Sequence, residues 1–348
     1  MASHETPNLE PDNILAAVVQ LGIGGNVPSV VAEFNGGECR VFKIRFKDEA
    51  SLAVRVLHPT DDCNHDNTIA AIQTEVRILQ TLEEKGFRWA PRYRGASLTF
   101  DNPVKHPFIV LTWIEGSPLL WDENFPPPPI RDALLAQLAS IQHSLITCTL
   151  ENGSTTATAF FERHLENRRA RVREGRISGL SEQDCFDQQA LLGRVLGRDQ
   201  DSTVFAIDHG DIKPDNIIVD ENYDIICLID WGFAALVPIA RAASLPRLFW
   251  PNHSAGIAPS PIILKDRQSY IRSFSSKTSE AALAMLRWQD AKDVDFRTLY
   301  LDSISSKGAH ISMAQIRWNP PYCEFLVDKE DGNVADGEPS VKGYAGHL

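Results

Sequence analysis

Five short runs rich in apolar residues, one of them clearly alternating with polar residues, lie in the first third of the chain. These runs are residues 27–34, 39–46, 52–57, 91–98 and 108–113. The alternation along residues 39–46, with turn residues such as Asn35-Gly36-Gly37 between the first two runs, is typical of β-strands joined by tight turns, and the other runs are strand-like in length and composition. Between the third and fourth runs, apolar residues recur every three or four positions over residues 68–85, which predicts an amphipathic helix. The pattern therefore predicts a small antiparallel sheet with one main helix.

Helical spacing dominates the rest of the chain. Helical patterns cover residues 130–145, 159–198 and 265–305, and a strand hairpin is expected at 217–229. We therefore expect an α+β fold in four parts. These parts are a leader with a short helix (1–24), an N-terminal lobe with the sheet and its helix (25–116), a mostly helical C-terminal lobe (117–328) and a flexible tail (329–348).

Composition and charge exclude several classes of protein. A length of 348 residues with 43% hydrophobic residues suits a folded protein of two lobes. The formal net charge of −12 argues against a general nucleic-acid-binding protein, which would present a basic surface. The N-terminus lacks the pattern of a secretion signal, no apolar run approaches the roughly 20 residues of a membrane span, and the six cysteines are scattered. We therefore expect a cytoplasmic protein with reduced thiols that binds neither nucleic acid nor membrane.

The most informative chemistry lies between His209 and Gly232. Asn216 follows Asp211 by five residues, and Asp230 follows Asp211 by nineteen, with the predicted hairpin between them. A loop that holds an acid and an amide, then a hairpin, then a second acid beside a glycine can bring three oxygen ligands together. Mg²⁺ prefers a few such oxygens together with the phosphates of a substrate. The spacing therefore predicts a magnesium–phosphate site.

Phosphoryl transfer needs metal ligands and a base near the acceptor hydroxyl, and this stretch offers candidates for both. Asp211 is the candidate catalytic base, because a carboxylate can orient a hydroxyl group and accept its proton. Asn216 and Asp230 are the candidate metal ligands. A single aspartate in a loop is usually an ordinary turn residue, but the combination of these groups at this spacing favours a site.

This stretch resembles the catalytic and metal-binding loops of the aminoglycoside phosphotransferase-like family (phosphotransferase enzyme family) of the protein-kinase-like superfamily. The resemblance rests on His209-Gly210-Asp211 and on Ile229-Asp230-Trp231-Gly232. It implies a two-lobed kinase-like fold, ATP and Mg²⁺ as cofactors, Asp211 as catalytic residue, and Asn216 and Asp230 as magnesium ligands. His209 would brace the loop.

Lys213 stands where protein kinases keep a lysine that touches the transferred phosphate, so the resemblance makes it a second catalytic candidate. Many small-molecule kinases lack this lysine, and the alternative is a solvent-facing loop residue. The motif Asp211-Ile212-Lys213-Pro214-Asp215-Asn216 thus shares features with both protein kinases and small-molecule kinases.

The N-terminal lobe should supply the groups that hold the nucleotide. Arg55 stands on the third strand where the superfamily has a lysine, and Glu75 on the following helix is suited to pair with it. Arginine is always charged and can hold a phosphate with its planar fork. The alternative is an ordinary surface ion pair, which is common and weak.

Two further nucleotide contacts are expected. The turn with Gly36 and Gly37 resembles a phosphate-covering loop, although it lacks the spaced glycines of protein kinases and could be only a hairpin turn. Glu115 follows an apolar run and fits the connector whose backbone meets adenine.

Acceptor recognition is expected in the C-terminal half, within residues 131–198 and 235–305. There, Trp250 and the run 246–249 could line a pocket or pack in the core.

The favoured function is an ATP- and Mg²⁺-dependent phosphotransferase that acts on a hydroxyl group of a small molecule. One alternative is a protein kinase, although no Ala-Pro-Glu element follows Gly232. Another is a catalytically weak, kinase-shaped nucleotide-binding or scaffold protein, which Arg55 and the sparse glycine turn would suit. The sequence leaves the acceptor, the choice between ATP and GTP, and the oligomeric state open.

Overall fold

The computed structural model describes residues 7–24, 28–47, 50–59, 65–249, 256–289 and 294–320. Its first part is a five-stranded antiparallel sheet with the strand order β1-β2-β3-β5-β4. The strands are β1 (Ser29–Asn35), β2 (Cys39–Arg45), β3 (Leu52–Leu57), β4 (Tyr93–Ser97) and β5 (Phe108–Thr112). All five predicted strands are therefore confirmed, with ends shifted by one or two residues.

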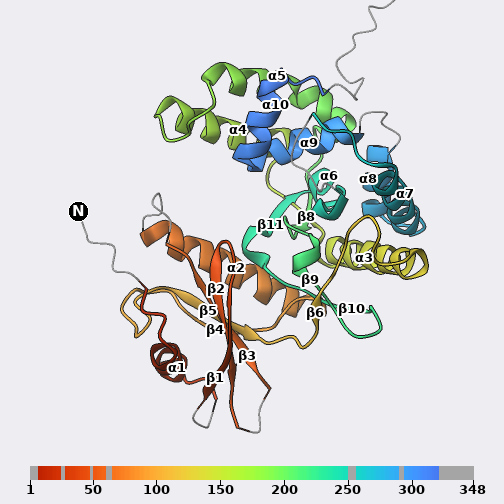
Figure 1. The fold of residues 1–348 in the computed structure, drawn as a ribbon. Helices are drawn as coiled ribbons and strands as arrows, with labels where there is room; N and C mark the ends of the chain where they lie inside the picture. Colours follow the sequence, from red (N-terminus) through yellow and green to blue (C-terminus); the bar gives the residue numbers. More distant parts are fainter. Residues whose placement is uncertain are drawn as a thin grey trace, which may run out of the picture.

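The two faces of this sheet are covered by different helices. Val54 and Val56 of β3 pack with helix α1 (Pro11–Gln20), while Ile109 and Leu111 of β5 pack on the opposite side with helix α2 (His65–Glu84). Side chains alternate between faces along a strand. Arg55 therefore lies on the α2 face, which in Figure 1 is the side turned toward the helical part of the chain.

Helix α2 presents one buried stripe to the sheet. Ile72, Glu75, Leu79 and Leu82 are all buried and recur at intervals of three or four residues. Three of them are apolar, and the fourth is the acid expected to pair with Arg55. The helix begins three residues before the predicted start, because its first turn is polar and has no apolar periodicity.

The rest of the chain is mostly helical (Figure 1). Its helices are α3 (Pro128–Thr149), α4 (Ala157–Arg173), α5 (Glu182–Leu196), α6 (Ile239–Ala242), α7 (Pro261–Ser275), α8 (Glu280–Gln289), α9 (Val294–Ser305) and α10 (Lys307–Gln315). The long helix α3 starts with prolines, which fit a first helical turn because the amide hydrogens there have no partner within the helix. It packs against α7 and strand β8, so it forms the centre of this part of the core.

Two small sheets lie between the five-stranded sheet and the helices. Their strands are β6 (Ser117–Pro118), β7 (Glu151–Asn152), β8 (Val204–Asp208), β9 (Ile217–Val219), β10 (Ile225–Leu228) and β11 (Ala235–Pro238). One sheet has the order β10-β9-β6 and the other β11-β8-β7. The hairpin β9–β10 was predicted, whereas β6, β7, β8 and β11 were not, because such short strands have no recognisable alternation.

The predicted α+β class is confirmed. The lobe boundary near residue 116 stays a prediction, and the predicted flexible tail lies outside the described residues. Within the part of the chain that the structure describes, no helix is both long and apolar enough to cross a membrane.

Candidate active site

A tight turn after strand β8 positions the catalytic candidate. The strand ends at Asp208, and Gly210 has a φ of +80°, a backbone conformation that side chains disfavour. A Cβ atom at Gly210 would lie 2.5 Å from the carbonyl oxygen of Phe233. Glycine is therefore required here for two reasons, and its absence of a side chain lets the loop of Asp211 cross the segment that follows Asp230.

His209 links these two segments through both ring nitrogens. Nε2 lies 3.1 Å from the carbonyl oxygen of Ile229, and the backbone N–H of Asp211 donates to Nδ1 over 3.3 Å. Only the neutral tautomer with hydrogen on Nε2 satisfies both bonds. Burial lowers the pKa of His209 to about 4, which agrees with a neutral ring, and Trp231 covers one side of it. The predicted bracing position of His209 is thus observed.

Asp211 is buried, and cations or amides contact both of its carboxylate oxygens. Lys213 Nζ lies 2.8 Å from Oδ2, and Arg247 Nη1 lies 3.0 Å from Oδ1. Burial opposes the charge of Asp211, but the hydrogen bonds from Lys213 and Arg247 outweigh it and lower the pKa of the carboxyl group. Asp211 is therefore ionised near neutral pH, and Lys213 faces it instead of facing only solvent.

Asn216 is held with a defined orientation by the same carboxylate. Its Nδ2 donates to the backbone oxygen of Asp211 over 2.9 Å and to Oδ2 over 3.1 Å. The backbone oxygen of Asn216 accepts the N–H of Ile229, which joins the loop to strand β10. With its nitrogen used in this way, the amide presents its oxygen as the group available to a cation.

Asp230, which lies just beyond β10, carries a left-handed backbone, with φ of +65° and ψ of +68°. Its Oδ1 accepts a hydrogen bond of 2.5 Å from Arg55 Nη1, and 31% of its side chain is exposed. Among the described residues, no three His, Cys, Asp or Glu side chains gather into a metal cage. A site made from Asn216, Asp230 and substrate phosphates does not need such a cage, because Mg²⁺ is commonly held by one or two protein carboxylates.

Arg55 connects three elements through a buried ion pair network. Its guanidinium on β3 pairs with Glu75 on α2 and with Asp230. Arg55 and Glu75 are both buried, so the alternative of a surface ion pair is wrong. Burial disfavours the charge on Arg55, but the two carboxylates outweigh this effect and raise its pKa.

A cavity of about 200 Å³ lies beside this network. It is lined by Glu38 and Cys39 from the end of the glycine turn and by Arg55, Glu75 and Asp230. Gly36 and Gly37 are not among its lining residues. The N–H of Gly36 donates to the carbonyl oxygen of Cys39 over 2.9 Å, as in a hairpin turn.

Glu115 is exposed and accepts a hydrogen bond of 2.7 Å from Lys43. Its side chain thus points to solvent, and the contact of its backbone with adenine stays a prediction.

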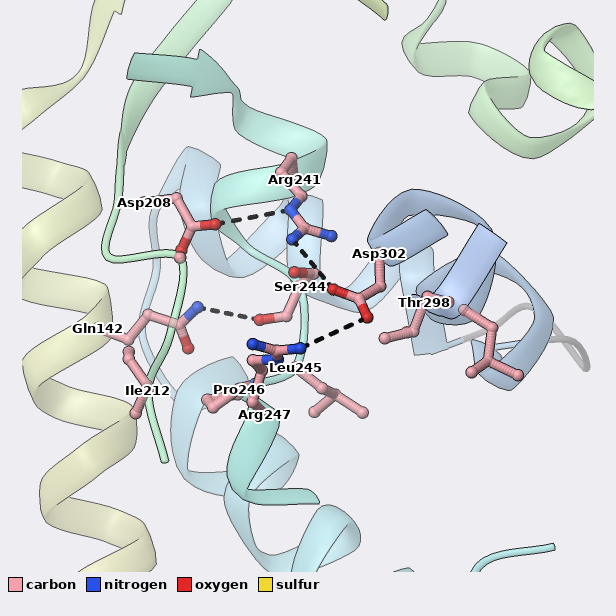
Figure 2. A pocket seen from close by; sticks show the side chains of 13 residues that line it. Gln142, Asp208, Ile212, Arg241, Ser244, Leu245, Pro246, Arg247, Thr298 and Asp302 are labelled. Carbon is pink, nitrogen blue, oxygen red and sulfur yellow. Dashed lines mark hydrogen bonds and ion pairs between the residues drawn. The ribbon is translucent and has the colours of Figure 1, made fainter. Parts of the chain in front are cut away.

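A larger cavity, of about 410 Å³, adjoins the loop of Asp211 and is lined there by Asp208, Gly210 and Arg247. A smaller one adjoins it, and both are lined by Asp208, Gly210, Arg241, Arg247 and Asp302. Figure 2 shows these charged side chains pointing toward one another, with ion pairs from Arg241 to Asp208 and Asp302 and from Arg247 to Asp302. Sequence reasoning expected an acceptor site in this half of the chain but missed Asp208, Arg241 and Asp302, which carry no local motif.

Residues 246–249 were expected either to line a pocket or to pack in the core, and the structure shows both. Pro246 and Arg247 line the smaller cavity, whereas Leu248 and Phe249 are buried in the core. Trp250 lies outside the described residues.

Comparison with known proteins found one matching family and several similar solved structures. The model of the family described as "Phosphotransferase enzyme family" matches residues 14–241, which is more than half of the chain. No curated protein sequence matches the chain.

Among solved structures, the streptomycin–ATP complex of APH(2'')-IIa is similar with a TM-score of 0.55 and 13% identity, over 91% of this chain and 98% of that one. ADP-bound APH(2'')-Ib gives a TM-score of 0.52 and 14% identity, over 86% and 92%. A candidate aminoglycoside phosphotransferase from Ralstonia eutropha JMP134 gives 0.54 and 17%, over 88% and 95%. At these identities the likeness shows the fold alone, and that fold is protein-kinase-like.

Substitution of Gly210 should test the close crossing at the turn. Gly210→Ala meets both a disfavoured φ and the Phe233 oxygen, so the free energy of unfolding should fall by at least about 3 kcal/mol. Gly175→Ala is the matched control, because Gly175 also has a positive φ, +71°, but a Cβ there has no neighbour within 4 Å. It should cost only about 1 kcal/mol. Equal losses in urea denaturation would contradict the steric argument.

The neutral state of His209 predicts a specific pH dependence. The pKa of His209 is lower in the folded chain than in the unfolded chain, so the stability from its hydrogen bonds is complete above pH 6.5 and is lost as pH falls toward 4. The difference in unfolding free energy between the protein and His209→Gln should shrink by about 2 kcal/mol between pH 7.5 and pH 5. A difference that does not change with pH would mean that His209 titrates normally.

Proposed function

The chain belongs to the phosphotransferase enzyme family, and we propose that it transfers the γ-phosphate of Mg²⁺·ATP to a hydroxyl group of a small molecule. The observation that carries the proposal is the position of Asp211. This ionised, buried carboxylate is hydrogen-bonded to the metal candidate Asn216 on one side and to Arg247 on the other, and Arg247 and the adjacent Gly210 line the cavity of about 410 Å³. The hydroxyl group of a small acceptor in that cavity could therefore approach the Asp211 carboxylate, as phosphoryl transfer to that hydroxyl group requires.

In this proposal Asp211 orients the acceptor hydroxyl group and accepts its proton as the bond to phosphorus forms. A carboxylate with a lowered pKa is a weak base, which suits phosphoryl transfer because the proton leaves late and positioning matters most. Lys213, at 2.8 Å from Asp211, adds a positive charge that can stabilise the transferred phosphoryl group. Gly210 and His209 hold the backbone of this loop in place.

The nucleotide would lie on the side of Arg55. Its guanidinium would contact the inner phosphates, Glu75 would keep it oriented, and the turn with Gly36 and Gly37 would cover the phosphates. The connector at Glu115 would meet the base of the nucleotide. Asn216 and Asp230 would hold Mg²⁺, which neutralises charge on the phosphates when bound. The donor set fits this ion, since it offers one amide oxygen and one partly exposed carboxylate.

Replacement of Asp211 should separate turnover from nucleotide binding. Asp211→Asn keeps the shape of the side chain but removes its charge, so ADP release with any accepted hydroxyl compound should fall by about a hundredfold or more. Stabilisation by Mg²⁺·ATP in thermal unfolding should persist. Asp215→Asn is the matched control, because Asp215 lies in the same loop and is exposed, and it should leave turnover unchanged. Equal turnover of the protein and Asp211→Asn would refute the proposed role.

Replacement of Arg55 should test the nucleotide side. Loss of Arg55 alone leaves Glu75 buried without its partner, which costs about 3–5 kcal/mol of stability, so the pair is replaced together as Arg55→Met with Glu75→Leu. This double variant should fold but lose at least about tenfold in affinity for Mg²⁺·ATP, because a phosphate contact is removed. Arg40→Met changes a partly exposed arginine that pairs with Glu33 and does not line the cavity beside Arg55, and it should have no effect. Unchanged nucleotide affinity of the double variant would favour a phosphate-independent role for Arg55.

A further inference from the structure

The wall of the 410 Å³ cavity combines an apolar body with a charged end. Aromatic and aliphatic side chains line most of it, and these are Phe160, Phe161, Phe233, Leu236, Leu301 and Ile304. The charged end is next to Asp211 and carries Arg241, Arg247, Asp208 and Asp302 (Figure 2). Since this cavity is the acceptor side of the proposed reaction, its charges bear on which class of hydroxyl compound is accepted, and the inference rests on the proposed function.

Arg241 has unused hydrogen-bonding capacity in this wall. Its contacts to Asp208 and Asp302 span 3.6 and 3.8 Å, and its guanidinium makes no hydrogen bond within the described part of the chain. Although only 15% of the side chain is exposed, none of its nitrogen atoms is among the described buried atoms without a partner, so its donors are open to the cavities that Arg241 lines. A guanidinium group whose donors lack acceptors can bind a carboxylate or a phosphate, because either group accepts two parallel hydrogen bonds.

Arg247 places a second cation beside the reacting position. Nη1 donates to Asp211 Oδ1 over 3.0 Å, and Nη2 lies 3.9 Å from Asp302 Oδ2. An acidic group that bound Arg247 would therefore lie close to a hydroxyl group that faces Asp211. The acceptor would need these two groups only a few bonds apart.

The balance of charges argues against a polycationic acceptor. Each aspartate of this wall faces an arginine, so a compound with several amino groups would find no carboxylate without a cationic neighbour. An amino group would also lie near two fixed guanidinium groups, and like charges at such distances repel. A single acidic group, in contrast, can use donors that the protein leaves unused.

We propose that Arg241 and Arg247 recognise an acidic group of the acceptor. The substrate class is a hydroxyl compound with an apolar body and one carboxylate or phosphate near the reacting hydroxyl group. Arg241 and Arg247 are thus specificity-determining residues of the same site, and polycationic amino sugars are poor acceptors.

Three matched probes test this selectivity by binding alone. Phenyllactate, phenyllactamide and phenylalaninol share a phenyl ring and a hydroxyl group but carry a carboxylate, a neutral amide and an ammonium group. Their affinities for the full chain are measured by ligand-observed NMR titration, both without nucleotide and with Mg²⁺·ADP. Phenyllactate should bind at least about tenfold tighter than phenyllactamide, because it adds charge-assisted hydrogen bonds, and phenylalaninol should bind weakest.

Variants then assign the preference to the two arginines. Arg241→Gln and Arg247→Gln should each remove most of the preference for phenyllactate over phenyllactamide. Arg176→Gln, at an exposed arginine that pairs with Glu174 far from this wall, should keep it. Asp302→Asn removes an opposing negative charge and should tighten phenyllactate binding, which keeps the test valid if an arginine variant does not fold.

Several outcomes would overturn the inference. Equal binding of the three probes, or no binding of any of them, would contradict it. So would tightest binding of phenylalaninol or of kanamycin. A preference for phenyllactate over phenyllactamide that survives both arginine substitutions would also contradict it. Failure of the proposed function would look different. In that case Mg²⁺·ATP would not stabilise the protein, and the order of probe affinities would be unaffected.

Discussion

The guanidinium group of Arg55, buried between two carboxylates, joins the sheet to the rest of the site. Arg55 lies on β3, Glu75 on α2 and Asp230 beyond β10, so one charge contacts three elements that are distant in the chain. Burial of a charge costs desolvation free energy unless groups of opposite charge surround it. The charge of Arg55 is therefore stabilised only when β3, α2 and the segment of Asp230 are assembled together. Arginine suits this position because its planar fork reaches two carboxylates at once, which a lysine would do less well.

The catalytic loop depends on a second set of contacts around Asp211. Neutral His209 joins Asp211 to Ile229, and Asn216 joins the same two residues from the other side. The charge of Asp211 is in turn matched by Lys213 and Arg247. Because Arg247 also lines the cavity, the electrostatics of the reacting position and of the acceptor wall are coupled. A substitution in the cavity wall is therefore expected to alter the electrostatic environment of Asp211, and a substitution at Asp211 that of the wall.

Family membership and acceptor choice rest on different parts of the molecule. The residues proposed to act in phosphoryl transfer lie in short motifs around Asp211 and Asp230, within residues 14–241 that the family model matches, except for the part of the proposed acceptor site beyond them. The proposed acceptor recognition, in contrast, uses charged residues of a cavity wall from β8, α6, α9 and the segment at Arg247. In this chain the aspartates of that wall face arginines, and this is the physical reason for proposing an acidic acceptor instead of a polycationic one such as the streptomycin in the APH(2'')-IIa complex.

The sequence alone determined the five-stranded sheet, its main helix, the β9–β10 hairpin and the candidate residues of one half of the site. Strand alternation placed Arg55 among apolar residues, helical spacing placed Glu75 on the buried stripe of α2, and the spacing after His209 identified Asp211, Asn216 and Asp230 as a set. All of these are local patterns set by backbone geometry. Tertiary structure alone decided that Arg55 also contacts Asp230 and that Arg241 and Arg247 share a cavity with Asp208 and Asp302. Those contacts join distant segments, and no local periodicity encodes which distant side chains meet when helices pack.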